Sequence, residues 1–223
     1  MFGHSTLQTV VINQDEAHGL AHAEYTCRAM QGRSDVVLPF TVIYRNLRTD
    51  SVVSCASVAL AIRDKQGFAI GTHTSRLSEV PPLGVGVWSG AVTASNGKPF
   101  IAELEVREVE RRPTGTGPDR FVPFPVERAR FNGKHDGHWN AAGEIANPYP
   151  KPLDDMRVIV LARDGDGLLT DSAETYVGPV AANRSVPFEV DSWGPGKPAR
   201  YEVITLPIVY HGGWEGLVAG RLG

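Results

Sequence analysis

Apolar and polar residues alternate along much of this chain, in short runs that glycine and proline separate. Alternation with a period of two places apolar side chains on one face of a strand and polar side chains on the other. The clearest runs cover residues 20–29, 40–45, 57–63, 101–109 and 156–163. The run over 101–109 is interrupted once, which predicts a β-bulge. No stretch carries the period of an amphipathic helix with a cap at each end, so the sequence predicts an all-β protein.

Four sequence landmarks occur twice, in the same order and about 100 residues apart. Self-similarity at a fixed period indicates that one structural module is repeated. The landmarks are an asparagine turn (Asn46 and Asn147), an apolar strand that ends in Arg-Asp-x-x-Gly (63–67 and 163–167), a Pro/Gly turn (80–84 and 177–180), and a Lys-Pro pair before a strand (98–99 and 197–198). We therefore predict two tandem copies of one antiparallel β-sandwich.

The boundary between the copies is predicted from composition. Residues 111–120 are rich in proline, glycine, threonine and charge, which is typical of a linker. The run 125–131 then has the pattern of a first strand. We place the first module at residues 1–115 and the second at 116–223, which ends in a glycine-rich tail.

The second copy resembles the bacterial FxLYD-type domains, in which Gly-x-hydrophobic-x-Asn precedes an apolar strand that closes on Asp-x-x-Gly. Residues 143–147, 158–162 and 164–167 supply these three parts. The first copy keeps Asn46 and the Asp-x-x-Gly turn, but it has Val and Ile where the family has glycine. The resemblance covers roughly 70 residues of each half. It implies two tandem immunoglobulin-like β-sandwich domains and a class of extracytoplasmic lipoproteins and accessory domains rather than catalysts.

Charge and hydropathy narrow the class of partner. A net charge of −3 argues against a nucleic-acid surface, which usually carries a basic excess. No run approaches the roughly 20 apolar residues of a membrane helix. The N-terminus lacks the pattern of a signal peptide, so the chain as written is expected to be cytoplasmic, or extracytoplasmic if an upstream signal has been removed. Cys27 and Cys55 could form one bridge, but the sequence favours two free thiols.

Acidic residues gather in one turn of the second copy. Asp164, Asp166, Asp171 and Glu174 are the kind of oxygen ligands that calcium requires. The loop lacks the EF-hand glycine, and the equivalent turn at Asp64 has no second carboxylate. Asp-Gly is also a preferred pair in hairpin turns. We interpret the segment as a plain turn and leave open whether Asp164, Asp166 and Asp171 bind a cation.

Histidines and a tryptophan form the densest polar-aromatic cluster of the sequence. His135, Asp136 and His138 could contribute to a metal site, but zinc normally needs three or four ligands of fixed geometry. Side chains three residues apart on a strand point to opposite faces. The pattern therefore favours an exposed loop that leads into a strand, with Trp139 packed on the sandwich.

Two functions remain as main hypotheses because no nucleophile, phosphate loop or cofactor motif is present in the sequence. The leading one is a non-catalytic scaffold or accessory protein that presents loops and edge strands to a protein partner or to another copy. The alternative is binding of a small molecule or carbohydrate in a cleft between the modules, lined by His138, Trp139, Tyr149 and Trp193. A metal-assisted hydrolase is a third hypothesis, with no catalytic residue that we can assign.

Overall fold

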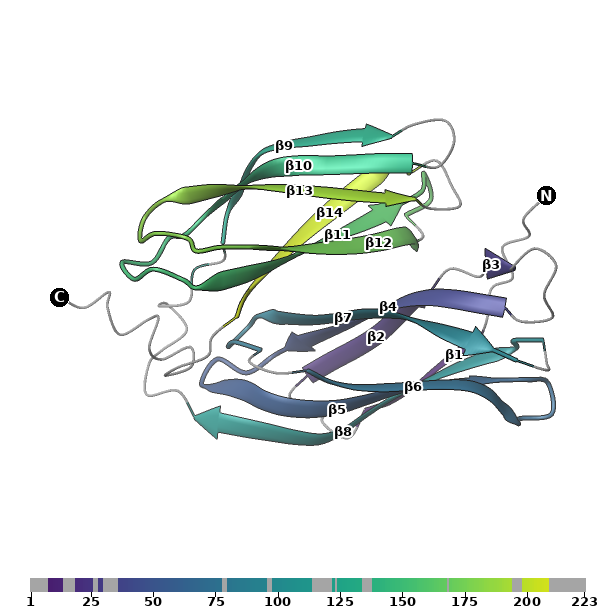
Figure 1. Cartoon of the computed structure of the whole chain (residues 1–223). Helices are drawn as coiled ribbons and strands as arrows, with labels where there is room; N and C mark the ends of the chain where they lie inside the picture. The colour runs from purple at the N-terminus through teal and green to yellow at the C-terminus, as the bar shows by residue number, and fades with distance from the viewer. Residues whose placement is uncertain are drawn as a thin grey trace. The chain divides into compact units, whose positions relative to one another are not determined.

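The structure is a computed structural model of the 223-residue chain. It describes residues 8–13, 19–25, 28–29, 36–77, 80–95, 98–113, 122, 124–133, 138–167, 169–193 and 198–208. In these ranges the regular elements are all strands, which confirms the all-β prediction (Figure 1). The chain divides into two compact units, Met1–Pro113 and Thr114–Gly223, where the sequence suggested a boundary after residue 115.

Unit 1 contains two sheets that share one core. The first has the order β1-β8-β5-β6, and in the second β4 pairs with β2, β3 and β7. Neighbouring strands are antiparallel except β1 and β8, which are parallel. The strands are β1 (Gln8–Asn13), β2 (Gly19–Tyr25), β3 (Arg28–Ala29), β4 (Val36–Asn46), β5 (Ser51–Arg63), β6 (Ala69–Leu77), β7 (Val85–Ala94) and β8 (Ile101–Pro113).

Unit 2 has two three-stranded sheets, with the orders β13-β10-β9 and β12-β11-β14. All of its pairings are antiparallel. The strands are β9 (Val126–Gly133), β10 (His138–Ala146), β11 (Asp155–Arg163), β12 (Leu169–Val177), β13 (Ser185–Trp193) and β14 (Arg200–Ile208).

The predicted alternation decides which side chains enter the cores. In unit 1, Phe40 and Val42 of β4 pack with Leu60 of β5 and Leu104 of β8, and all four are essentially inaccessible to solvent. Thr41, which we expected on the polar face of β4, is buried as well, and its hydroxyl hydrogen-bonds the Ser89 hydroxyl at 3.1 Å. The partner on β7 satisfies the hydroxyl, which is why a threonine can be buried there.

Strand β11 is apolar on both faces. Met156, Val158 and Val160 are fully buried, as the alternation predicts, and so are Ile159 and Leu161 on the opposite face. A central strand covered on both faces has a near-continuous apolar sequence rather than a strict alternation.

The expected bulge is also present, since the register between β5 and β8 shifts around Cys55.

The two units repeat the same pairings. β4 pairs with β7 and β5 pairs with β6 and β8, just as β10 pairs with β13 and β11 pairs with β12 and β14. In the equivalent pairs β4-β7 and β10-β13, Val42 lies opposite Trp88 and Gly143 lies opposite Phe188. The counterpart of Trp88 is therefore Phe188.

The Pro/Gly turns also correspond differently from the sequence alignment. An isolated bridge joins Val53 to Val80 in unit 1, and the same bridge joins Leu153 to Val180 in unit 2. Val80 thus corresponds to Val180, whereas the sequence aligned it with Val177. Proline stands at different places in the two turns, so matching prolines misplaced the alignment by three residues.

The predicted linker begins later than its composition suggested. Residues 111–113 belong to β8, and Pro113 lies opposite Ser51 of β5. Arg111 donates to the side chains of Asn46, at 2.8 Å, and of Tyr44, at 3.0 Å. These contacts hold the end of β8 in the ladder although its composition is typical of a linker.

Candidate functional site

Trp139 lies in the core of unit 2 and does not line a surface. Its side chain is fully buried, and its ring lies 5.7 Å from that of Tyr201. The indole Nε1 donates to Asp171 Oδ2 at 3.0 Å, and the Ser192 hydroxyl donates to the same oxygen at 2.7 Å. A buried carboxylate needs such donors to offset its lost hydration. Asp171 therefore joins β12 to β10 and β13 from inside the sandwich.

Tyr149 is also a core residue. It is fully buried, and its ring packs on Phe124 with the ring centroids 5.4 Å apart. Its hydroxyl donates to the carbonyl of Val122 at 2.9 Å and accepts from the amide of Val122 at 3.0 Å. These bonds attach the segment before β9 to the body of the unit. In this structure neither Trp139 nor Tyr149 presents surface to a ligand, because packing inside the sandwich uses both aromatic side chains.

His138 and Trp193 lie opposite each other on β10 and β13. His138 is half-buried, and its Nε2 lies 3.8 Å from Asp191 Oδ1. The side chain of Trp193 lies outside the described residues, as do His135 and Asp136. The structure thus brings two of the four predicted lining residues together at one end of a sheet and places the other two in the core.

The landmark asparagines each form several hydrogen bonds to backbone groups. The Asn46 amide nitrogen donates to the carbonyls of Ser51 and Pro81 at 2.8 and 2.9 Å, and its oxygen accepts from the Arg48 amide at 3.1 Å. Asn147 repeats the pattern: its amide nitrogen donates to the carbonyls of Lys151 and Ala181 at 2.8 and 3.3 Å, and its oxygen accepts from the Tyr149 amide at 3.0 Å. Both asparagines are buried. Their role in the structure is to satisfy backbone groups where the chain crosses between the sheets.

The acidic residues of the predicted cation loop do not converge. Asp164 accepts the amide of Asp166 at 3.0 Å within the turn, Asp171 points into the core, and Glu174 forms an ion pair with Arg157. In the described ranges no group of three or more His, Cys, Asp or Glu side chains is placed to hold a metal ion. Gly167 adopts a φ of 87°, the left-handed conformation that an Asp-x-x-Gly turn requires. The turn interpretation is therefore sufficient for Asp164.

Glu103 and Cys55 are two further titratable side chains of unit 1. Glu103 accepts from both guanidinium nitrogens of Arg63 that face it, at 2.9 and 3.2 Å. The hydrogen bond from Arg63 lowers the pKa of Glu103 below its usual value, against a smaller effect of burial. Cys55 is half-buried and carries a free thiol, whereas Cys27 lies outside the described residues.

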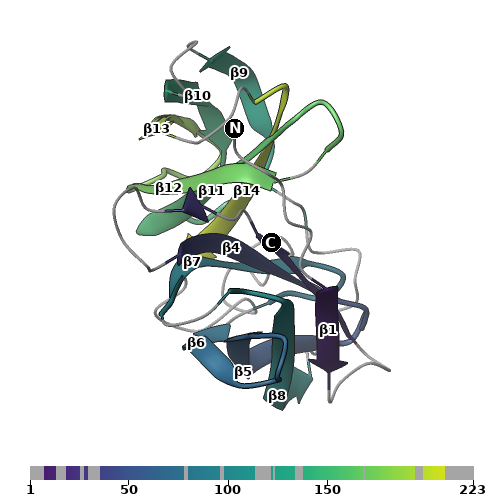
Figure 2. The same cartoon turned by 90° about the vertical axis from the view of Figure 1, so that its right-hand side faces the viewer.

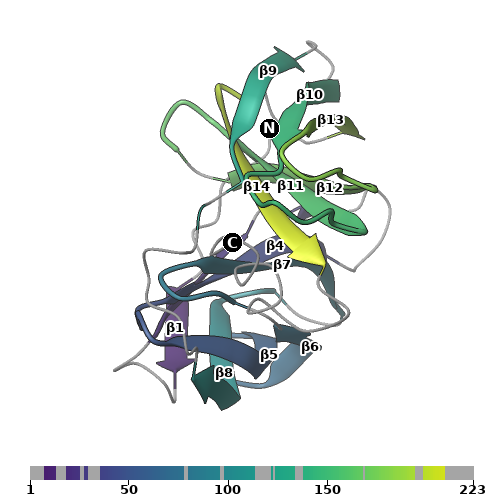
Figure 3. The same cartoon turned by 90° about the vertical axis from the view of Figure 1, so that its left-hand side faces the viewer.

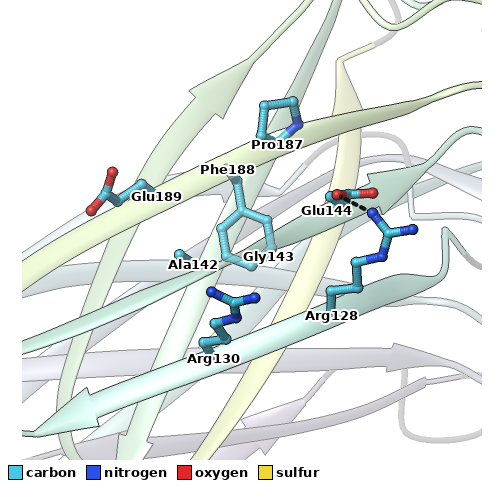
Figure 4. A pocket seen from close by; sticks show the side chains of 8 residues that line it. All are labelled: Arg128, Arg130, Ala142, Gly143, Glu144, Pro187, Phe188 and Glu189. Carbon is cyan, nitrogen blue, oxygen red and sulfur yellow. Dashed lines mark hydrogen bonds and ion pairs between the residues drawn. The ribbon is translucent and has the colours of Figure 1, made fainter.

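An open depression of about 550 Å³ lies on the outer face of the β9-β10-β13 sheet (Figure 4). Ala142 and Glu144 of β10 lie opposite Glu189 and Pro187 of β13, and cross-strand neighbours share a face of the sheet. Arg130 of β9 lies opposite Ala142 on the same face. The floor is thus small and apolar, and charged side chains form the rim.

A β-bulge shapes one end of this depression. The register of β9 shifts between Ala142 and Glu144, and Arg128 adopts a φ of 51° there. The bulge turns the Arg128 guanidinium toward Glu144, which accepts from it at 2.8 Å. Glu189 accepts from Asn140 at 2.9 Å. Arg130 forms no ion pair with any described residue, so the depression offers one guanidinium to an acidic group. Sequence reasoning missed this site because the bulge that builds it has its positive φ at Arg128 and not at a glycine.

Four strands of unit 2 are paired on one side only within the described part of the chain. They are β9 and β13, which pair with β10, and β12 and β14, which pair with β11. β12 and β13 also contact each other, whereas β9 and β14 lie at the opposite edges of the two sheets. Such edges present backbone donors and acceptors that another strand can use. Figures 2 and 3 both show β9 and β14 on the same side of the unit.

Comparison with known proteins shows weak structural likeness without any sequence match. No protein-family model and no curated protein sequence matches the chain. The crystal structure of red sea bream transglutaminase aligns with 85% of this chain at 10% sequence identity, with a TM-score of 0.22. The chain spans 31% of the length of that protein. None of the described residues forms a helix long and apolar enough to cross a membrane.

Proposed function

We propose that this chain is a non-catalytic binding or scaffold protein that recruits a protein partner through the edge strands of its sheets. The observation that carries the proposal is that β9 and β14 are each paired on one side only in the described residues. An edge strand binds an extended segment through main-chain hydrogen bonds, while pockets for alternate side chains supply specificity.

The use of polar side chains supports this proposal. The side chains of Asp171, Asn147 and Tyr149 form hydrogen bonds to other groups within unit 2. The β9 and β14 edges, by contrast, have no strand paired on their outer side among the described residues, and each is hydrogen-bonded to a central strand on its inner side. An edge that is already part of a sheet loses little conformational freedom on binding, which favours affinity.

We also propose that the two units are copies of one immunoglobulin-like module related to the FxLYD-type domains. The shared strand pairings and the matching bonds of Asn46 and Asn147 support common descent. This kinship would place the protein among accessory domains.

The experiment is capture with the immobilised full chain, followed by purification of each captured protein and direct measurement of its affinity. Thr205→Pro removes an amide from the β14 edge, and Glu189→Ala alters the other sheet and serves as the matched control. We expect the purified partner to bind the Glu189→Ala variant normally and the Thr205→Pro variant at least tenfold more weakly. A chain that is strictly monomeric by light scattering and captures no protein would refute the proposed function.

A second candidate function is binding of a small acidic molecule or acidic sugar in the depression on β9-β10-β13. The guanidinium of Arg130, which lacks an ion pair with described residues, favours it. Titration of uronic acids and small dicarboxylates by calorimetry tests this candidate. Binding that Arg130→Ala abolishes would support it, and no heat with any of these probes would remove it.

A further inference from the structure

In unit 1 a separate strand closes one side of the sandwich. β1 lies along β8 in parallel, with six residue pairs from Gln8 opposite Ile101 to Asn13 opposite Val106 (Figure 2). β1 also contacts β2, the edge strand of the facing sheet. The Asn13 side chain donates to the carbonyl of Gly19 at 2.8 Å, which links the end of β1 to the start of β2. β1 therefore occupies the side where the edges of the two sheets meet.

Unit 2 presents the equivalent side without such a strand among its described residues. β14 corresponds to β8, because Arg163 lies opposite Arg200 as Arg63 lies opposite Ile101. β9 corresponds to β2, since each pairs with the first central strand of its sheet. Across this side the ring of Tyr201 stacks on that of Phe131, with the centroids 4.6 Å apart. Figure 3 shows β14 in yellow at this side of the unit.

The inward-facing residues of β14 are less buried than those of β8, as expected for an edge without an added strand. The inward-facing residues of β8, which β1 covers, are Ala102, Leu104 and Val106, and all are fully buried. Their counterparts on β14 are Tyr201, Val203 and Thr205, and all three are only half-buried. An added strand would remove apolar surface from water as well as pair the backbone.

Alternate backbone amides and carbonyls of β14 point away from β11 and can pair with an added strand. The carbonyl of Arg163 accepts from the amide of Ala199, so the backbone amides and carbonyls of the odd-numbered residues of β11 point toward β14. The even-numbered residues of β14 bond to them, which leaves the amides and carbonyls of Tyr201, Val203 and Thr205 at the open edge. Pro207 has the same parity, and a proline is tolerated where its nitrogen faces an edge. The open edge therefore ends at residue 206, and its length matches the six pairs that β1 makes.

We propose that β14 binds an extended segment of a partner protein, which runs parallel to β14 and places apolar side chains alternately over Tyr201, Val203 and Thr205. This inference rests on the proposed function and names its site. The occupant comes from outside the chain because the chain has one β1 segment and it is seated on β8. Transfer of β1 to the β14 edge of a second copy would expose β8 and gain no strand pair.

The test uses the full chain and a synthetic peptide of residues 6–14, which contains the strand seated on the equivalent edge. Amide hydrogen exchange is followed with and without the peptide. We expect slower exchange at residues 201, 203 and 205, and no change at residues 102, 104 and 106, where tethering gives β1 a high effective concentration.

Two N-methylated peptides provide matched controls that leave the protein unchanged. One is methylated at Val10 and Ile12 and the other at Thr9 and Val11, so each loses the amides of one edge only. We expect one to bind within about threefold of the parent peptide and the other at least tenfold more weakly. Equal binding by both would overturn the proposal, because a ladder uses one edge of the peptide.

The other outcomes separate this inference from the proposed function. Protection at β8, β9 or another edge instead of β14 would overturn the β14 site and leave strand addition as the function. No protection at any strand would also overturn the inference, while the capture experiment would still decide the function. Protection of β14 before peptide is added would overturn it too, since the edge would then be covered by the chain's own tail or, if dependent on concentration, by a second copy.

Discussion

Removal of the Asn46 side chain is expected to destabilise unit 1 strongly. Asn46 is fully buried, and its amide nitrogen donates to the carbonyls of Ser51 and Pro81 at 2.8 and 2.9 Å. Its oxygen accepts from the Arg48 amide and from the Arg111 guanidinium at 3.1 and 2.8 Å. Alanine would remove these bonds, although the Pro81 carbonyl would keep the Gly84 amide and the Arg111 guanidinium would keep the Tyr44 hydroxyl, each at 3.0 Å.

The magnitude follows from the number of groups that lose a bond. A buried donor or acceptor left unsatisfied costs about 1–3 kcal/mol, and the two carbonyls are the most enclosed of the four groups. We therefore expect Asn46→Ala to lower the free energy of unfolding of unit 1 by about 3–5 kcal/mol. Asn46→Asp should be no better at neutral pH, because a carboxylate cannot donate to the two carbonyls and repels them.

The assay is urea denaturation of the full chain, with amide exchange used to assign each transition to a unit. Asn147→Ala should produce a similar loss in unit 2 because its bonds repeat those of Asn46. Asn140→Ala is the matched control, since its bonds to Glu189 and Asp191 are exposed and should be worth less than about 0.5 kcal/mol. A loss below about 1 kcal/mol for Asn46→Ala would refute the assignment of the asparagine as the main backbone partner at this turn.

Three further predictions concern the turns, an ion pair and the core. Leu83 and Asn183 both have a φ of 54° in equivalent turns. In thermal unfolding, Leu83→Asn should therefore stabilise unit 1 by about 1 kcal/mol, and Asn183→Leu should destabilise unit 2 by a similar amount. An effect of opposite sign would show that backbone strain does not dominate at these positions. Glu103→Gln should cost less than about 1 kcal/mol at pH 7. Because Arg63 holds the folded-state pKa of Glu103 below its ordinary value of 4.5, this stabilisation is complete above that pH and is lost as the pH falls through the lower folded-state value. A difference between variant and parent that does not shrink as the pH is lowered below 4.5 would contradict the ion-pair account. Tyr201→Phe should leave the free energy of unfolding within about 0.5 kcal/mol at neutral pH, because the buried hydroxyl has no hydrogen-bond partner among the described residues. The substitution should also abolish the loss of stability above pH 10 that burial of this phenol, with its raised pKa, causes; a large loss at neutral pH would reveal a further hydrogen bond of the hydroxyl.

The strands were predictable where one face of a sheet is buried, because a period of two is then imposed directly on the sequence. Phe40, Val42, Leu60 and Leu104 follow this rule and form the core of unit 1. β1 was not predicted, since residues 8–13 have three successive apolar residues and no alternation. Its parallel pairing with β8 joins segments about 90 residues apart, and no local pattern encodes such a partner.

The candidate site was less predictable than the fold. Trp139 and Tyr149 were selected as aromatic residues, but an aromatic side chain can serve a core or a surface with the same sequence neighbourhood. The partner that fixes Trp139 is Asp171, on a different sheet. The depression around Arg130 depends on a bulge at Arg128, where a non-glycine residue takes a positive φ without any turn motif. Tertiary packing decides both features.

The most direct test of the open edge is amide hydrogen exchange of the free, full-length chain, measured residue by residue. The comparison is between Ala102, Leu104 and Val106, which β1 covers, and their counterparts on β14. An open edge predicts that the amides of residues 201, 203 and 205 exchange at least tenfold faster than those of residues 102, 104 and 106 under conditions that leave both units folded. Equal or greater protection of β14 would show that this edge is already paired and would contradict the account.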